Sequence, residues 1–198
     1  MESGDISRIA REIIRNHNPN IRFMGCISSD EILQLPIGEV KKTNGRAGAM
    51  MMISVVNILP RRENPTRMGH WILCVVTNHK IIFMDSYGMH PGVYSPFIRA
   101  FIDTHSQKRR VSYLDTRLQD AKSYVCGAYI LFFIYIIARF GLDLIKEHLS
   151  RVFSKTDYRG NDKKVLNFLY KNYNMPPCKT TFCRKGMSYQ QCKIHFCW

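Results

Sequence analysis

The chain has 198 residues, 45% of them hydrophobic, and a formal net charge of +14. This length and composition exclude a disordered chain, and they fit a single globular domain over 1–198 with a sizeable core. The charge arises from 29 Lys and Arg against 15 Asp and Glu, which favours a polyanionic partner.

The first element that we expect is an amphipathic helix near the N-terminus. Its apolar residues recur at helical spacing: Ile6, Ile9, Ala10, Ile13 and Ile14. The residues before them are polar, so we expect neither a signal peptide nor a membrane anchor.

Two strands are expected in the middle of the chain. Residues 71–76 and 81–85 are rich in β-branched and aromatic side chains and flank a turn-like segment, which predicts a β-hairpin. With a two- or four-residue loop, His70 lies directly or diagonally across from Asp85 on one face, because side chains alternate with period two. With a three-residue loop, the two side chains lie on opposite faces.

The most apolar stretch begins at Cys126. Residues 128–138 carry no charge, which predicts a buried helix that falls short of the ~20 residues needed to span a bilayer. Cys126 then lies at a helix N-terminus, where unpaired N–H groups and the helix dipole favour the thiolate. Gln119 can loop back from the irregular run before it, so that its side-chain N–H and the Cys126 backbone N–H form an oxyanion hole.

Together these residues have the composition of a thiol-protease site. The predicted roles are His70 as base, Asp85 as orienting acid, Gln119 as oxyanion donor and Cys126 as nucleophile. Taken singly, each fits an ordinary structural role at a strand end, in a turn, in a loop or in the core. The catalytic interpretation therefore depends on their joint order and on the Gly-His-Trp and Cys-Gly sequences around two of them.

The order and spacing resemble those of the adenovirus proteinases, the adenains, and more distantly the proteases that process SUMO and other ubiquitin-like proteins. The resemblance extends from the N-terminal helix through a strand at Met51 to Ile58 to a late helix at Val165 to Tyr173. It implies an α+β fold with a central mixed sheet flanked by helices. It also implies a papain-like active site with a circularly different order of groups: His, acid, Gln, Cys.

The resemblance implies a viral cysteine endopeptidase that cleaves structural and core precursor proteins during virion maturation. Such an enzyme acts in the virion and in the infected host cell, in the nucleus or at the site of particle assembly, and prefers glycine beside the scissile bond. DNA and a viral peptide are the implied activators, and we expect no metal or organic cofactor. The expected protein is a monomer without a membrane partner.

Two other functions are alternatives to this one. The main alternative is a deconjugating protease that removes ubiquitin-like modifiers from host targets. A basic packaging protein that retains an inactive protease fold is a third hypothesis, and the complete set of four catalytic residues argues against it.

Two positions depart from the adenain pattern. Asp85 stands where the adenovirus enzymes have glutamate, whereas the proteases of ubiquitin-like proteins have aspartate there. The adenovirus activating peptide forms a disulfide near the strand that matches Val111 to Tyr113, where this chain has no cysteine. We therefore do not expect a covalently held peptide at that site.

Basic residues form scattered clusters such as Lys108-Arg109-Arg110. No sequence-reading motif accompanies them, so non-specific binding to the DNA backbone is favoured over base recognition. Solvated surface charge is the alternative. Loops are expected over 35–49, 60–69 and 90–95. The two that flank the hairpin, 60–69 and 90–95, are candidate walls of a substrate cleft.

The tail over 176–198 is basic and rich in cysteine. Its spacing is a weak zinc signal carried by Cys178, Cys183, Cys192 and Cys197. Free thiols, disulfides and a metal clip all remain open, with free thiols ranked first. A fourth hypothesis is that the tail acts in cis where adenain uses its peptide.

Overall fold

A five-stranded mixed sheet forms the centre of the computed structural model, which describes residues 1–40, 51–63 and 69–174. Its strands are β1 (Ile21–Ser28), β2 (Met51–Asn57), β3 (Trp71–Val76), β4 (Lys80–Met84) and β5 (Arg110–Tyr113), and they lie in that order. The β1–β2 and β4–β5 pairs are parallel, and β2–β3 and β3–β4 are antiparallel. The tail cysteines and most of the 35–49 loop lie outside the described residues.

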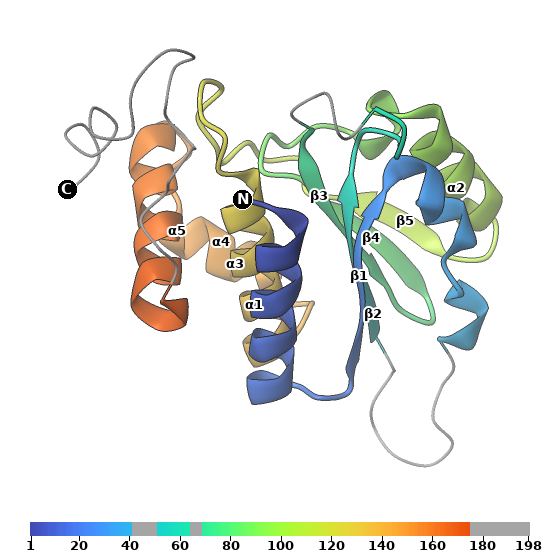
Figure 1. Ribbon diagram of the computed structural model, residues 1–198, viewed down its shortest axis with the longest axis horizontal. Helices are drawn as coiled ribbons and strands as arrows, with labels where there is room; N and C mark the ends of the chain where they lie inside the picture. The colour runs from blue at the N-terminus through green and yellow to red at the C-terminus, as the bar shows by residue number, and fades with distance from the viewer. Residues whose placement is uncertain (41–50, 64–68, 175–198) are drawn as a thin grey trace.

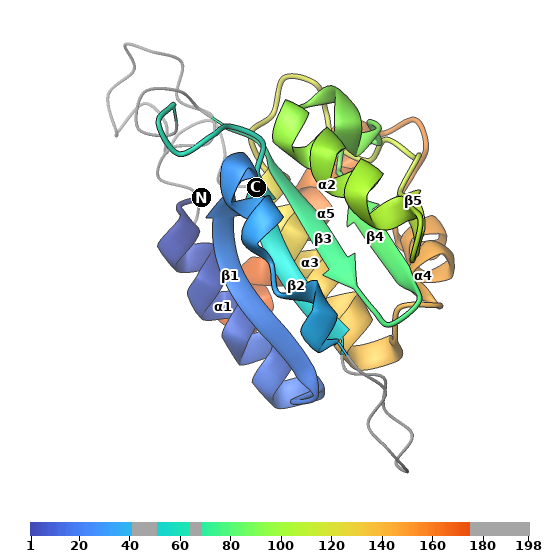
Figure 2. The same ribbon diagram turned by 90° about the vertical axis from the view of Figure 1, so that its right-hand side faces the viewer.

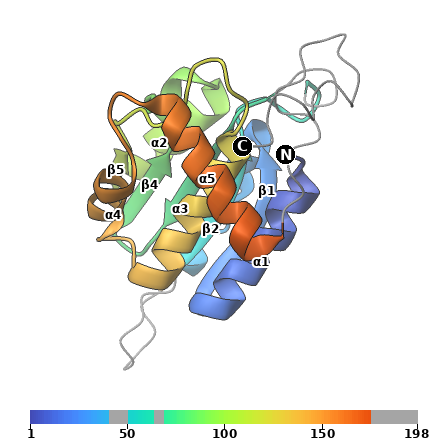
Figure 3. The ribbon, with the colours of Figure 1, turned by 90° about the vertical axis from the view of Figure 1, so that its left-hand side faces the viewer.

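Helices cover both faces of the sheet, which confirms the predicted α+β class (Figure 1). One face carries α1 (Ser3–His17) and α3 (Cys126–Phe140), and α5 (Tyr158–Tyr173) packs on the outer side of α3 (Figure 3). α4 (Ile145–Val152) also contacts α3. The other face carries α2 (Pro96–Ser106), seen in front of the sheet in Figure 2, and the short 3-10 helices η1 (Ser29–Gln34), η2 (Ile37–Glu39) and η3 (Pro91–Val93).

The inner strands are apolar because both of their faces are buried. Alternate residues point to opposite sides: Ile53 and Leu73 belong to the core beneath α1 and α3, whereas Met52 and Ile72 belong to the core beneath α2. This alternation gives the sheet two apolar layers with almost no polar positions on β2 and β3.

α3 is apolar on nearly all sides because it lies between other elements. It contacts α1, β3, α4 and α5, and twelve of its residues are buried. A helix in such a place needs no polar face. Within the described residues, no helix combines the length and apolar character needed to cross a membrane.

The register of the β3–β4 hairpin decides between the two loop alternatives. Leu73 pairs with Met84 and Val76 pairs with Ile81, which leaves residues 77–80 between the last partners. Continued toward the strand ends, this register places Asp85 diagonally across from His70 on one face. The register is therefore that of a loop with an even number of residues, and not that of the three-residue alternative.

Candidate active site

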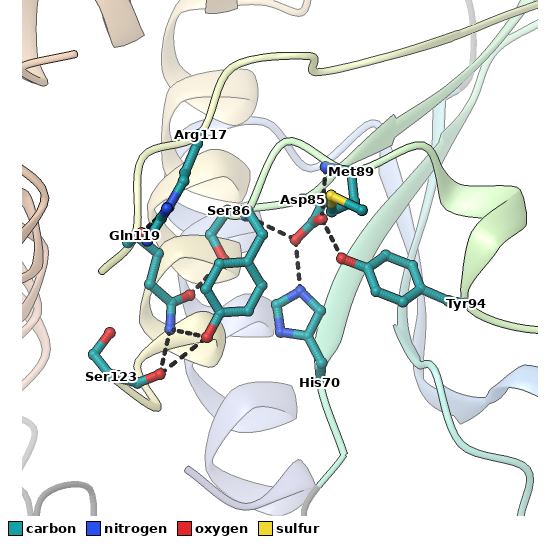
Figure 4. A network of polar contacts seen from close by, with 9 residues as sticks. His70, Asp85, Ser86, Met89, Tyr94, Arg117, Gln119 and Ser123 are labelled. Carbon is teal, nitrogen blue, oxygen red and sulfur yellow. Dashed lines mark hydrogen bonds and ion pairs between the residues drawn. The ribbon is translucent and has the colours of Figure 1, made fainter. Parts of the chain in front are cut away.

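Three chain segments bring the predicted thiol, base and acid together. His70 directly precedes β3, Asp85 directly follows β4, and Cys126 is the first residue of α3. The His70 Nε2 atom lies 2.5 Å from Asp85 Oδ1 (Figure 4). The His70 side chain and the Cys126 thiol are close enough for each to shift the pKa of the other. Because Nε2 is held by the acid, Nδ1 is the ring nitrogen that remains for the thiol.

Four hydrogen bonds fix the Asp85 carboxylate. Oδ1 accepts from His70 Nε2 and from the Tyr87 backbone N–H, at 3.0 Å for the latter. Oδ2 accepts from the Met89 backbone N–H at 3.0 Å and from the Tyr94 hydroxyl at 2.6 Å (Figure 4). Burial raises the pKa of Asp85, but the His70 hydrogen bond and charge, with the Tyr94 hydroxyl, outweigh it and lower the pKa. The acid is therefore ionised beside the imidazole.

The Cys126 thiol is set up to ionise. Burial acts to raise its pKa, but the hydrogen bond and charge of His70 and the backbone N–H groups of Trp71 and Gly127 lower it overall. Val125, at the N-cap of α3, has no polar side chain to take up the first helical N–H groups. The Gly127 N–H, one of these groups, acts instead on the thiol and lowers its pKa.

The imidazole is held in its charged form. Burial acts to lower the pKa of His70, but hydrogen bonds and charges from Asp85 and Cys126 raise it to about 9. Two aromatic rings pack around it, Tyr87 with ring centroids 4.7 Å apart and Tyr94 at 5.7 Å. These shifts favour a thiolate–imidazolium pair whose imidazole is oriented by the Asp85 carboxylate. A thiolate in such a pair is a nucleophile for acyl transfer.

A close approach of α1 explains the glycine after the cysteine. A Cβ atom at Gly127 would lie 3.1 Å from Ile6 Cδ1 and 3.2 Å from Met1 Cβ. A methyl group there would require the Ile6 and Met1 side chains to shift by a few tenths of an ångström. The Cys-Gly pair therefore combines a nucleophile with a packing requirement.

Gln119 lies beside Ser86, in the turn that follows Asp85, and is fully buried. Its Oε1 accepts from Ser86 Oγ at 2.6 Å, and its Nε2 donates to the Ser123 carbonyl at 2.9 Å and to Tyr87 Oη at 3.1 Å. Figure 4 shows the amide between Ser86 and Ser123, close to the histidine. The structure thus brings Gln119 into the site, and its role as an oxyanion donor stays a prediction, because both Nε2 hydrogens have acceptors here.

Sequence reasoning missed the roles of Ser86, Tyr87 and Tyr94. A signal for the first two exists in the sequence of the turn from Asp85 to Gly88. Gly88 has a positive φ of 70°, and a Cβ there would lie 2.7 Å from the Arg117 backbone nitrogen. Only glycine fits this turn without strain.

The other predicted features lie away from this cluster or outside the described residues. Among the described residues no group of three or more His, Cys, Asp or Glu could hold a metal ion. In the basic cluster, Arg109 donates to the carbonyls of Ile37 and Thr77, at 3.0 and 3.3 Å. Arg109 thus serves the fold, while Lys108 and Arg110 are exposed.

Comparison with solved structures supports the fold. ChlaDub1 from Chlamydia trachomatis superposes with a TM-score of 0.53 at 12% identity, over 86% of this chain and 92% of that chain. A de-sumoylating protease (TM-score 0.48, 14% identity, 88% and 85% covered) and AvrA delL154 with IP6 and CoA (0.39, 12%, 80% and 54%) are more remote, and no argument rests on them. Neither a protein-family model nor a curated protein matches the sequence. At such low identity the likeness shows the α+β fold alone.

Proposed function

We propose that the chain is a cysteine protease with Cys126 as nucleophile, His70 as base and Asp85 as orienting acid. The observation that carries the proposal is the buried His70–Asp85 contact of 2.5 Å, together with the electrostatic coupling of the same imidazole to the Cys126 thiol at the start of α3. Isolated core histidines and cysteines have no need of such an arrangement.

The chemistry follows from the positions of these groups. The Cys126 thiolate attacks the scissile carbonyl carbon of the substrate. The carbonyl oxygen becomes an oxyanion, which is stabilised by N–H donors that include the side-chain amide of Gln119. His70 gives its proton to the leaving nitrogen, and a thioester to the acyl part of the substrate remains. A water molecule, deprotonated by His70, then attacks the thioester and releases the carboxylate product.

A ubiquitin-like modifier is the substrate class that we favour. The acid is Asp85, as in the resembling proteases of ubiquitin-like proteins, and the likeness to ChlaDub1 covers nearly all of that chain. The adenain-type cysteine near Val111 to Tyr113 is missing. The protein would then cleave after the glycine at the end of the modifier and release it from its target.

Processing of viral structural precursors is the second candidate. Its support is the +14 charge, which suits an enzyme that works on DNA-bound substrates inside a particle. In this function DNA, and a viral peptide held without a disulfide, would stimulate cleavage. The place of action would be the virion and the infected cell.

One experiment separates these candidates. Purified protein is incubated with SUMO and ubiquitin conjugates, and in parallel with a library of short peptides, with and without DNA. Cleavage of conjugates with little turnover of short peptides supports deconjugation, whereas DNA-stimulated cleavage of peptides with glycine beside the scissile bond supports precursor processing. If Cys126→Ala cleaves as fast as the parent in either assay, the proposed chemistry is wrong.

A further inference from the structure

Ser86 is hydrogen-bonded to Gln119 through both its backbone carbonyl and its side-chain hydroxyl. Its carbonyl accepts from the backbone N–H groups of Leu118 and Gln119, at 2.8 and 3.0 Å. Its hydroxyl donates to Gln119 Oε1 at 2.6 Å. Both side chains are fully buried, so water does not compete for these groups. Since Ser86 follows Asp85 directly, one turn holds the acid on one side and the amide on the other.

The contacts of the Gln119 side chain identify which end of its amide is Nε2 and which is Oε1. A carbonyl only accepts hydrogen bonds, so the end of the Gln119 amide that faces the Ser123 carbonyl must be Nε2. The other end is then Oε1, which requires a donor, and Ser86 Oγ supplies it. Without that donor a buried acceptor would be left unpaired, which favours rotation of the amide.

Tyr87 holds the Nε2 end. Its hydroxyl accepts from Gln119 Nε2 at 3.1 Å and donates to the Ser123 carbonyl at 3.0 Å, while its ring packs on His70. Burial first, and then the negative charge of Cys126, raise the pKa of Tyr87 to about 12. The hydroxyl therefore keeps its proton over the working range of the site. Through this hydroxyl the Nε2 end of the amide is joined to the ring that packs on His70.

We propose that Ser86 and Tyr87 are positioning residues that hold the Gln119 amide with Nε2 toward Cys126, where it serves as the oxyanion donor. The inference rests on the proposed function, because it assigns a task to groups around the same site. During the reaction the oxyanion takes the hydrogen that Tyr87 Oη accepts at rest. A charged acceptor forms the stronger hydrogen bond, so this exchange is favourable.

The test compares turnover with thiol alkylation in three variants. Ser86→Ala removes the donor to Oε1, and its kcat should fall by about ten- to a hundred-fold, less than the loss of an entire oxyanion donor. Tyr87→Phe keeps the ring on His70 and should lower kcat by a smaller factor, about three- to ten-fold. The pH profile of iodoacetamide alkylation of Cys126 should stay unchanged in both, because alkylation forms no oxyanion. Tyr170→Phe, an exposed tyrosine on α5, is the control and should match the parent.

The outcomes distinguish this inference from the proposed function. Unchanged kcat in both variants, or a fall in turnover matched by an equal fall in alkylation, overturns the inference. A fall in Ser86→Ala alone supports the role of Ser86 and overturns that of Tyr87. If the parent cleaves nothing, the proposed function fails, and the side-chain amide signals of Gln119 in a ¹H–¹⁵N spectrum decide the inference. Signals that shift in Ser86→Ala and Tyr87→Phe support it, and unmoved signals overturn it.

Discussion

At the scale of single residues, the environments of two buried cysteines differ in a way that predicts reactivity. Burial acts to raise the pKa of both, but Cys126 has His70 and two backbone N–H groups to lower it, whereas Cys74 has burial alone and its pKa is raised. Cys126→Ala should abolish the fast phase of iodoacetamide labelling at neutral pH and all turnover. Cys74→Ala is the matched control and should keep both. Mass spectrometry of the labelled peptides identifies the reacting thiol, and dominant labelling of Cys74 would contradict the assignment.

The ion pair also predicts a difference between two pH profiles. As pH rises through the lowered pKa of Cys126, the thiolate forms, and both alkylation and turnover increase. Above the pKa of His70, about 9, the imidazole is neutral. Alkylation then continues, because the thiolate persists, but turnover falls, because the leaving nitrogen needs a proton from His70. Parallel rate measurements from pH 4 to 11 check this, and turnover that keeps rising at high pH would remove His70 as the acid.

Replacing the acid by an amide should separate catalysis from folding. In Asp85→Asn the side chain can donate to His70 Nε2, which holds the imidazole in the wrong tautomer, so we expect the rate to fall by about ten- to ten-thousand-fold. His70→Ala should be at least as damaging. Steady-state kinetics measures the loss. An Asp85→Asn variant as active as the parent would mean that another group orients His70.

The same substitution has a pH-dependent effect on stability. The pKa of Asp85 is lowered in the folded state, so its contribution to stability is present above the carboxyl's unfolded pKa and is lost as pH falls through the folded one. The melting temperatures of the parent and of Asp85→Asn should therefore converge in acid. Thermal unfolding at several pH values provides this comparison.

At the scale of elements, the sequence predicts what has a strong local pattern. The hairpin and the helix that begins at Cys126 follow from β-branched runs and from an uncharged apolar stretch, and both are confirmed. α2 was not predicted, although Ser95 and Pro96 are a helix-start signal: Ser95 Oγ accepts from the Phe97 N–H. The hydrogen bonds between Ser86 and Gln119 could not be predicted from the sequence. They join two irregular segments that come together only because of how the whole sheet is arranged.

The contact between the starts of α1 and α3 can be tested with two glycines. Gly127→Ala places a methyl group about 3.1 Å from Ile6 Cδ1, so overpacking should lower the free energy of unfolding by about 1–3 kcal/mol. Gly4→Ala lies within α1 and meets nothing within 4 Å. It should be neutral or stabilising by up to about 1 kcal/mol. Denaturant unfolding of both variants checks the contrast, and equal stabilities would show that α1 yields without cost.

At the scale of the whole molecule, the excess of positive charge predicts non-specific, salt-dependent binding to DNA. A chain of net charge +14 should bind duplexes without sequence preference, and random-sequence competitors should displace one another equally. Binding releases condensed counterions, so affinity should fall with salt at a log–log slope of about 0.9 per phosphate neutralised. Shared binding to DNA would also raise the cleavage of basic, DNA-bound substrates by increasing their local concentration.

The structure refines which basic residues to change. Arg109 should be left in place, because it bonds to the carbonyls of Ile37 and Thr77 and its loss would disturb the fold. The double variant Lys108→Gln/Arg110→Gln removes two exposed positive charges. It should lower the magnitude of the log–log salt slope by up to the amount expected for about two phosphate contacts, and it should leave cleavage of a neutral peptide unchanged. Titration of fluorescent DNA at several salt concentrations measures the slope. Salt-independent binding, or no binding at low salt, would contradict a role for DNA in the mechanism. The positive charge would then be ordinary solvated surface charge.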